Sequence, residues 1–192
     1  MKEKKVSGKI KGSLKFDGRL VLTGDLEVED HIKAREIIGN DYFILTGDSI
    51  TAGGSIISYG PIIAGGSIIS YGPITAGDSI KAGGSIKAGG SIKAGGSIKA
   101  GGFITAGDSI LAQLYIECGT TLAAGLYIYA GLITWREFED GDDLIECGKL
   151  KKGEIKYGKL KETGIKEIEI DGKKYSEQTI KNALKLKRRK ND

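Results

Sequence analysis

The sequence has few of the residues that ordinary globular cores and disulfide or metal frameworks use. Its 192 residues include one histidine, one tryptophan, four phenylalanines and two cysteines. Two cysteines are too few for a disulfide framework and lack metal-ligand spacing, so a reducing cytosol is the default compartment. No run of about 18 apolar residues exists, which excludes a membrane-spanning helix. The charged start is not followed by the hydrophobic stretch of a secretory signal. We therefore expect a cytoplasmic protein with no membrane partner.

The sequence also lacks the motifs of the common enzyme classes. It contains no Gly-x-Ser-x-Gly elbow, no Walker loop and no cluster of histidine and cysteine. The only histidine, His31, falls at a predicted corner rather than beside a candidate nucleophile. Cys118 is expected to be a small core residue. Cys147 lies in a second copy of Ile-Glu-Cys-Gly, which indicates duplication rather than a redox pair. The sequence thus predicts a non-enzymatic protein with no cofactor and no bound metal.

Glycine and isoleucine are abundant and strictly periodic. Counting in sixes from Leu14 gives Leu or Ile at every step to Ile128, and residues 79–102 are almost pure Ser-Ile-Lys-Ala-Gly-Gly. A fixed period of this kind is the signature of a repeat architecture. The 31 glycines do not indicate disorder, because disordered glycine-rich segments lack a regular apolar partner.

Each six-residue unit predicts a short strand followed by a corner. We label its positions a to f, with Leu or Ile at a and a small residue, most often Ala, at c. Side chains two apart in a strand point the same way, so a and c face inward and b outward. Glycines at d and e are expected to supply the positive φ angles of a sharp corner. At c, Asn40 and Thr46 are expected to form internal hydrogen bonds.

Repeating this unit predicts an all-β solenoid, a parallel β-helix with triangular coils of about 18 residues. The order of aliphatic and then small residue, over residues 6–130, resembles bactofilins, the polymer-forming cytoskeletal proteins, more than hexapeptide acyltransferases. We assign residues 1–133 to the β-helix, with six to seven coils between Leu14 and Ile128. The bactofilin resemblance implies a structural scaffold that polymerises end to end through open β-edges.

After Ile128 the six-residue register fails, and residues 134–148 are predicted to form a cap and an acidic loop. Trp135 and Phe138 are expected to cover the last open coil, because a solenoid must close its end. This lid argues against end-to-end polymerisation. The acidic run that follows does not match the spacing of a calcium loop. We therefore expect a solvated loop rather than a metal site.

Residues 149–192 are predicted to form a small basic module. From Leu150 to Ile170 apolar residues recur every five positions, which indicates short strands with tight turns. Asp171-Gly172 suits the type I′ turn of a β-hairpin, and Ser176 can cap a final helix. The run Tyr-Ser-Glu-Gln-Thr-Ile-Lys-Asn-Ala-Leu resembles the tails of small accessory proteins of bacteriophages. That resemblance implies a mobile-element origin, in a class that includes anti-defence proteins of the anti-CRISPR type.

This module also carries the charge asymmetry of the chain, with 15 Lys and Arg against 7 Asp and Glu. We expect it to engage a host protein or nucleoprotein, with nucleic-acid contact through the basic C-terminus. The alternative is a solvated helix end whose charges complement the helix dipole. The candidate partner-binding residues are Lys181, Lys185, Lys187, Arg188, Arg189 and Lys190.

The outward b positions predict two belts around the rod. The repeat lysines Lys81, Lys87, Lys93 and Lys99 turn to different sides, so only Lys81 and Lys99 stack. Three aliphatic residues lie outward in one coil beside two tyrosines, and exposed apolar groups of this kind often mark association. The alternative is that other segments cover them or that they reflect β-propensity alone. The candidate homodimer interface is Ile57, Ile63, Ile69, Tyr59 and Tyr71.

Overall fold

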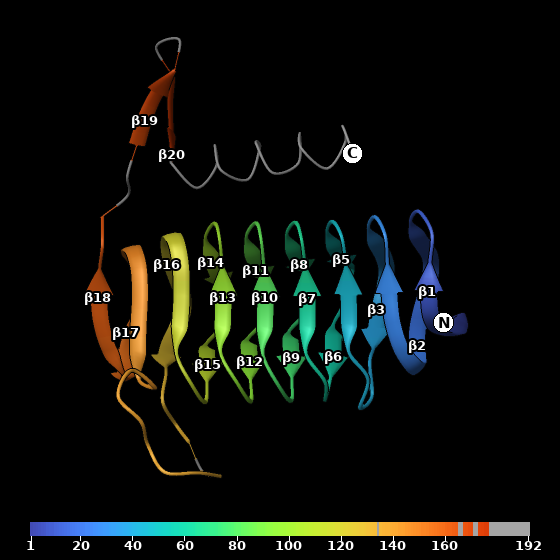
Figure 1. The fold of residues 1–192 in the computed structure, drawn as a ribbon, viewed down its shortest axis with the longest axis horizontal. Coiled ribbons are helices and arrows are strands. Elements are labelled where there is room, and N and C mark those ends of the chain that lie inside the picture. Colours follow the sequence, from blue (N-terminus) through green and yellow to red (C-terminus); the bar gives the residue numbers. More distant parts are fainter. Residues whose placement is uncertain (134, 165–166, 171–172, 177–192) are drawn as a thin grey trace.

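A computed structural model describes residues 1–133, 135–164, 167–170 and 173–176 of the chain. It is a parallel β-solenoid of about nine coils of about 18 residues, which confirms the predicted all-β solenoid (Figure 1). Eighteen strands form one continuous sheet that winds around the core, and β19 and β20 form a separate two-stranded sheet.

The strand bounds follow the repeat closely in the middle of the rod. The strands are β1 Glu3–Ile10, β2 Leu14–Val28, β3 Ile32–Ile38, β4 Ile44–Thr46, β5 Ile50–Ala52, β6 Ile56–Ser58, β7 Ile62–Ala64, β8 Ile68–Ser70, β9 Ile74–Ala76, β10 Ile80–Ala82, β11 Ile86–Ala88, β12 Ile92–Ala94, β13 Ile98–Ala100, β14 Ile104–Ala106, β15 Ile110–Ala112, β16 Ile116–Tyr129, β17 Leu144–Tyr157, β18 Lys159–Glu162, β19 Glu167–Ile170 and β20 Lys173–Ser176.

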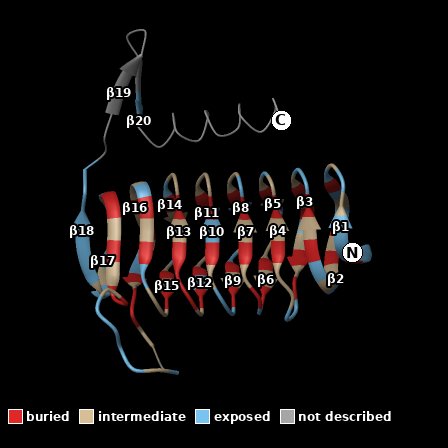
Figure 2. Ribbon diagram, in the orientation of Figure 1, coloured by how far each residue is buried: buried red, intermediate tan, exposed pale blue. Residues whose placement is uncertain are grey.

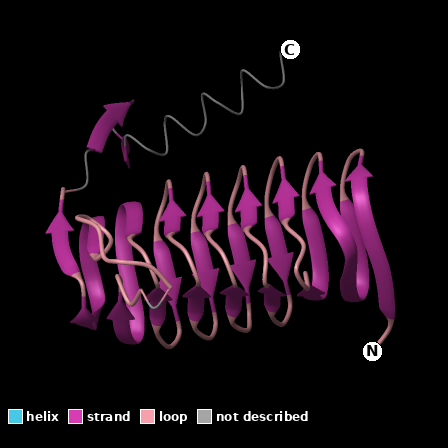
Figure 3. Ribbon diagram, turned by 60° about the horizontal axis from the view of Figure 1, so that its bottom comes forward, coloured by secondary structure: helices cyan, strands magenta, loops and turns pink. Residues whose placement is uncertain are grey.

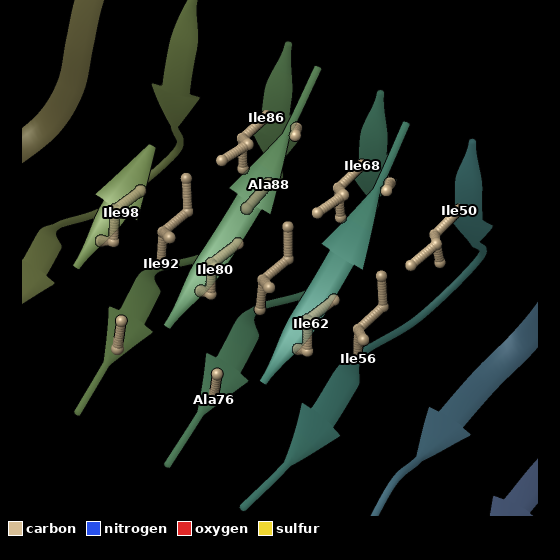
Figure 4. Close-up of a cluster of buried hydrophobic side chains, with 14 of the residues drawn as sticks. Ile50, Ile56, Ile62, Ile68, Ala76, Ile80, Ile86, Ala88, Ile92 and Ile98 are labelled. Carbon is tan, nitrogen blue, oxygen red and sulfur yellow. The ribbon is translucent and has the colours of Figure 1, made fainter. Parts of the chain in front are cut away.

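The core consists of stacked isoleucines and alanines, as the hexad predicts. In the three-residue strands the first and last residues are buried and the middle one is not, as in β10 and β13. In the central coils each core residue stacks on the residue 18 positions further on, so Ile80 pairs with Ile98 and Ala82 with Ala100. Figure 4 shows these isoleucines converging inside the triangle of strands. The central coils therefore bury nearly the same isoleucines and small residues against their two neighbours, which is how a repeat without buried aromatic residues builds a core.

Small polar residues complete the hydrogen bonding between coils. At position f, the hydroxyl of Ser49 accepts from the N–H of Ser67 at 3.1 Å, and Ser67 accepts from Ser85 at 3.0 Å. At position c, the hydroxyls of Thr46 and Ser58 donate to the carbonyls of Asp30 and Tyr42. The expected hydrogen bond of Thr46 is therefore confirmed, because a buried hydroxyl needs a partner.

One hexad departs from the sequence register. In the second half of β3 the inward residue is Ile37, which is fully buried, whereas Ile38 faces outward and pairs with Val21 and Ile57. Gly39 then takes the small inward position, where an added Cβ would collide with the Ser58 side chain. Asn40 was expected to face inward, but it lies exposed at the corner with φ of 50° and donates to the Leu22 carbonyl at 2.8 Å.

The corner glycines are required for a different reason than the one predicted. None of the glycines between Gly18 and Gly125 has a positive φ. At Gly95 a Cβ would instead lie 2.8 Å from the carbonyl carbon of Gly77 in the preceding coil, and closer still to its oxygen. The expectation of left-handed corners is therefore wrong. These positions exclude side chains because the backbones of stacked coils approach one another closely.

The solenoid continues beyond the point where the six-residue register ends. After β16 the chain leaves the rod in a loop that includes residues 132–133 and 135–141, and on its return β17 pairs in parallel with β16 (Figures 1 and 3). Leu150 stacks on Leu122 and Ile155 on Ile128, so the five-residue period belongs to a tighter coil of the same helix rather than to separate strands. Gly153 and Gly158, with φ of 107° and 117°, form its shortened corners.

Trp135 and Phe138 do not form the expected lid. They are 58% and 48% exposed, and β17 covers β16 instead, with β18 covering the first residues of β17. β1 likewise adds a coil before β2, so the rod is longer than the six to seven coils predicted. Figure 2 shows that the terminal strands β1 and β18 are largely exposed.

The predicted hairpin is present as the antiparallel pair β19 and β20, in which Ile168 lies opposite Tyr175. None of the described residues is helical. The helix predicted after Ser176 falls on residues 177–192, which lie outside the described residues, as do the hairpin residues Asp171 and Gly172.

Candidate interaction surfaces

The apolar side chains of the predicted oligomer interface lie on the outside of one coil but do not form one patch. Ile57, Ile63 and Ile69 are the outward residues of β6, β7 and β8, the three consecutive sides of a triangular coil. Ile69 is 37% exposed and the other two are half-buried. A flat partner can therefore contact only one of these three isoleucines at a time.

One side of the rod nevertheless gathers an aliphatic ladder, which we call the Ile57 face. Val21, Ile38 and Ile57 occupy the same outward position in three successive coils. Tyr59 follows β6 at one margin, and Tyr71 precedes the neighbouring strand β9 at the other. These tyrosines are 71% and 78% exposed. The count in sixes assigns Ile38 to the core, but the register slips by one residue there. Sequence reasoning therefore missed Ile38 as the aliphatic residue that stacks on Ile57.

The repeat lysines form a belt, as predicted. Lys81 and Lys99 are register partners, whereas Lys87 stacks on Ile69 and Lys93 on Thr75. Lys99 donates to Glu117 at 2.6 Å in the next coil, and this hydrogen bond raises the pKa of Lys99. The belt therefore presents separated cations on all three sides rather than a groove for a polyanion.

A denser group of lysines lies at the C-terminal end of the rod. The lysines of β17 and β18 are all exposed, and three of them contact carboxylates. Lys156 lies 2.6 Å from Glu154, and Lys161 lies 3.1 Å from Glu146. Within the described part of the chain, Lys149, Lys151 and Lys152 have no ion-pair partner. We call these three the β17 lysines. The predicted partner-binding residues Lys181, Lys185, Lys187, Arg188, Arg189 and Lys190 lie outside the described residues.

The acidic loop is anchored rather than fully solvated as expected. Asp142 and Asp143 are 7% and 9% exposed. Arg136 donates to Asp142 at 2.7 Å, and this bond raises the pKa of the guanidinium. Desolvation alone would raise the pKa of Asp142, but the N–H of Glu139 and the Arg136 charge outweigh it and hold the pKa below its ordinary value. Asp143 contacts Lys159 at 3.5 Å, so the loop is tied to β18.

A shallow groove runs along the rod on the side that carries Leu45 and Ile63. Its volume is about 750 Å³, and Leu45 and Ile63 contribute apolar surface to its lining. Glu27, Glu29, Asp30 and Asp48 make one part of it acidic, and Lys81 lies among the other lining residues. Glu27 is paired with Lys9 at 2.9 Å, which moderates that charge.

The coil geometry also brings Ser13 beside His31, two residues whose 18-residue spacing would have predicted the contact. The Ser13 hydroxyl lies 3.1 Å from Nδ1 of His31 and 3.4 Å from a carboxylate oxygen of Asp30. In a catalytic triad the carboxylate contacts the imidazole, whereas here Ser13 contacts both of the other groups. Asp30 and His31 therefore compete for the single hydroxyl proton of Ser13. This arrangement does not orient the histidine as a base.

Among the described residues, no group of three or more His, Cys, Asp or Glu side chains is placed to hold a metal ion. The same residues include no helix with the length and apolar character needed to cross a membrane. Comparisons with protein families, curated proteins and solved structures found no match for this chain. The solenoid fold is therefore assigned from the geometry of the structure. The resemblances to bactofilins and phage accessory proteins are interpretations of the residue pattern.

Proposed function

We propose that the chain is a non-enzymatic binding protein whose basic C-terminal part contacts an acidic protein or nucleoprotein partner. The observation that carries this proposal is the lysine-rich last coil, where β17 and β18 present exposed cations at one end of a rigid rod. Three of these cations are not neutralised by a neighbouring carboxylate in the described part of the chain. Clustered lysines and arginines attract polyanions and make the affinity depend steeply on salt.

The proposed contact surface combines the β17 lysines with the basic C-terminal segment. That segment holds Lys181, Lys185, Lys187, Arg188, Arg189 and Lys190 and is predicted from sequence to be helical. In this proposal the solenoid is a scaffold that holds one end of the surface fixed. The resemblance of the tail to phage accessory proteins supports a role as an inhibitor of a host protein or nucleoprotein complex, of the anti-defence type.

The test compares three charge-matched variants of the full chain. One replaces Lys149, Lys151 and Lys152 by Gln, and a second replaces Arg188, Arg189 and Lys190 by Gln. The control replaces Lys81, Lys87 and Lys93, which lie on the belt, and so removes the same net charge from the middle of the rod. Binding to a labelled DNA duplex and to polyglutamate is measured by fluorescence anisotropy at several salt concentrations.

The proposal expects each C-terminal variant to weaken binding to one of these polyanions by about tenfold or more. On DNA it also expects the slope of log affinity against log salt to fall by about 0.9 for each phosphate that the variant no longer neutralises. The belt control should change both quantities little. If all three variants lost affinity equally, the change in net charge alone would explain the loss, and the proposal would be overturned. Failure of the wild-type chain to bind either probe at low salt would also overturn it.

The alternative function is a bactofilin-like scaffold that polymerises end to end. The observation that favours it is the open edge of the sheet at β1 and β18, each paired on one side only within the described residues. Both ends are basic, with five lysines and one glutamate in residues 2–11 and six lysines and two glutamates in residues 149–162. Charged edges of this kind oppose edge-to-edge association.

Light scattering and electron microscopy across a salt series distinguish the two functions. A scaffold with like-charged ends would form filaments that lengthen as salt screens the repulsion. A discrete monomer or dimer at all salt concentrations excludes the scaffold. For the dimer, the Ile57 face is the proposed contact, and Ile57→Lys should convert a dimer to a monomer, whereas Ile69→Lys on another side should not.

A further inference from the structure

The two cysteines of the chain meet in the core, although 28 residues separate them in the sequence. Cys118 of β16 and Cys147 of β17 are register partners in adjacent parallel strands. Both are free thiols, 3% and 0% exposed. They lie at the inward position c of one column, where Ala82 and Ala100 occupy the two preceding coils. The loop that includes residues 132–133 and 135–141 is inserted between the two cysteines, so their contact joins the chain before the loop to the chain after it.

The spacing of the strands suits a covalent bond between these residues. Adjacent strands lie about 4.8 Å apart, which falls within the Cα separation of about 4.4–6.8 Å found in disulfides. The two side chains are register partners and both point into the core from the same column. The interaction with Cys147, followed by burial, raises the pKa of the Cys118 thiol, and the interaction with Cys118 lowers the pKa of Cys147.

We propose that Cys118 and Cys147 are an oxidative modification site, at which an intrachain disulfide fastens the last coils of the solenoid to the rest of the rod. The sequence alone indicates duplication rather than a redox pair, and the proposal replaces that interpretation because the register places the two cysteines side by side. The repeat does not need sulfur here, because alanine fills the same column elsewhere. The disulfide would close a loop that contains the whole insertion. It would hold β17, and through it β18, in place when the end of the rod opens. This inference does not depend on the proposed function.

The reaction needs an oxidant, for which a small-molecule disulfide suffices. The Cys147 thiolate attacks one sulfur of the small disulfide, forms a mixed disulfide and releases one small thiolate. Cys118 then loses its proton, and its thiolate attacks the Cys147 sulfur and releases the second. The two protons from the cysteines end on the two small thiols, so the protein loses two electrons and two protons in total. Because both sulfurs are buried, the exchange takes place when the terminal coil opens, and refolding then shields the product.

The experiment uses the full chain equilibrated in buffers of oxidised and reduced glutathione, at a temperature that allows the terminal coils to open. Intact mass and peptide mapping detect the disulfide, and circular dichroism follows the melting temperature. The matched control is the Cys118→Ala/Cys147→Ala double variant, since alanine occupies this column in the preceding coils. A second control, Ala100→Cys/Cys147→Ala, moves the pair to a coil without an insertion.

The proposal expects a mass loss of two hydrogens, a linked peptide pair containing Cys118 and Cys147, and a melting temperature several degrees higher in the oxidised form. The double alanine variant should melt at the same temperature in both buffers. Mixed glutathione adducts or intermolecular dimers in place of the internal link would overturn the proposal. So would a disulfide that forms without raising the melting temperature. If the Ala100→Cys pair oxidises while the native pair stays reduced, the native site is not a modification site.

Discussion

Replacing one core isoleucine in the middle of the rod has a cost that can be worked out from its neighbours. Ile86 of β11 is fully buried and stacks between Ile68 and Ile104. Ile86→Ala removes three carbon atoms, which at about 0.8 kcal/mol each corresponds to roughly 2.4 kcal/mol of lost transfer free energy. A cavity term is added because the coils above and below hold the site open. We expect a total of about 3–4 kcal/mol, within the usual range for this substitution.

The matched control is Lys87→Ala, one residue further along the same strand. Lys87 points outward and is exposed, so its replacement should change the free energy of unfolding by less than about 0.5 kcal/mol. For a chain of this length about 2–4 °C of melting temperature corresponds to 1 kcal/mol. Ile86→Ala should therefore lower the melting temperature by roughly 6–16 °C in circular dichroism. If Lys87→Ala destabilised the chain as much as Ile86→Ala, the inside and outside of the repeat would be assigned wrongly.

Four further substitutions test the corners, the polar core and the loop. In a denaturant titration, Gly95→Ala should destabilise the rod by about 1–3 kcal/mol, because a Cβ there meets the Gly77 carbonyl. Gly53→Ala should be neutral or stabilising in the same titration, because the nearest atoms to its Cβ, on Arg35, lie 3.8 Å away. Ser58→Ala should cost about 1 kcal/mol of unfolding free energy, because the hydrogen bond to a neighbouring carbonyl is removed; an unchanged urea midpoint would contradict this. Asp142 has a depressed pKa, so its contribution is present above the unfolded value of about 3.9 and disappears as pH falls through the lower folded value. The melting-temperature difference between wild type and Asp142→Asn should therefore shrink in acid, and a constant difference from pH 7 to pH 2 would be inconsistent with the ion pair to Arg136.

The fold was predictable from the sequence because one period specifies strand, corner and core at once. The position of Ile80 predicted its burial and its stacking on Ile98 18 residues away. The same rule failed at Ile38, since Ile37 is also aliphatic and a one-residue shift leaves the count in sixes intact. Which of two adjacent isoleucines enters the core depends on how the next corner closes, and periodicity does not contain that information.

The end of the rod was harder to predict for a related reason. Strict periodicity shows a solenoid only while each side keeps its length, and the sides of the last coil are five residues long. The inserted loop added a second break, so Leu150 and Ile155 were assigned to separate short strands although they stack on Leu122 and Ile128. The duplicated Ile-Glu-Cys-Gly segment was the available signal. Its two copies lie one above the other, and this contact makes Cys118 and Cys147 neighbours.

The candidate interaction surfaces depend on stacking more than on composition. The coil distributes Ile57, Ile63 and Ile69 over three sides, as a belt around the rod predicts. Only the three-dimensional register shows that Ile38, between Val21 and Ile57, extends the side that carries Ile57. The lysine belt was predicted correctly because its coils contain no slip.

Spin labelling tests the coil length most directly. In a background without the native cysteines, nitroxides are attached at Lys81→Cys together with Lys99→Cys, and in a second variant at Lys81→Cys together with Lys93→Cys. The solenoid places the first pair in adjacent strands about 4.8 Å apart and the second pair on different sides of the triangle. Continuous-wave spectra should show strong dipolar broadening for residues 81 and 99 and little for residues 81 and 93. Equal broadening of both pairs, or stronger broadening of the second, would contradict an 18-residue coil.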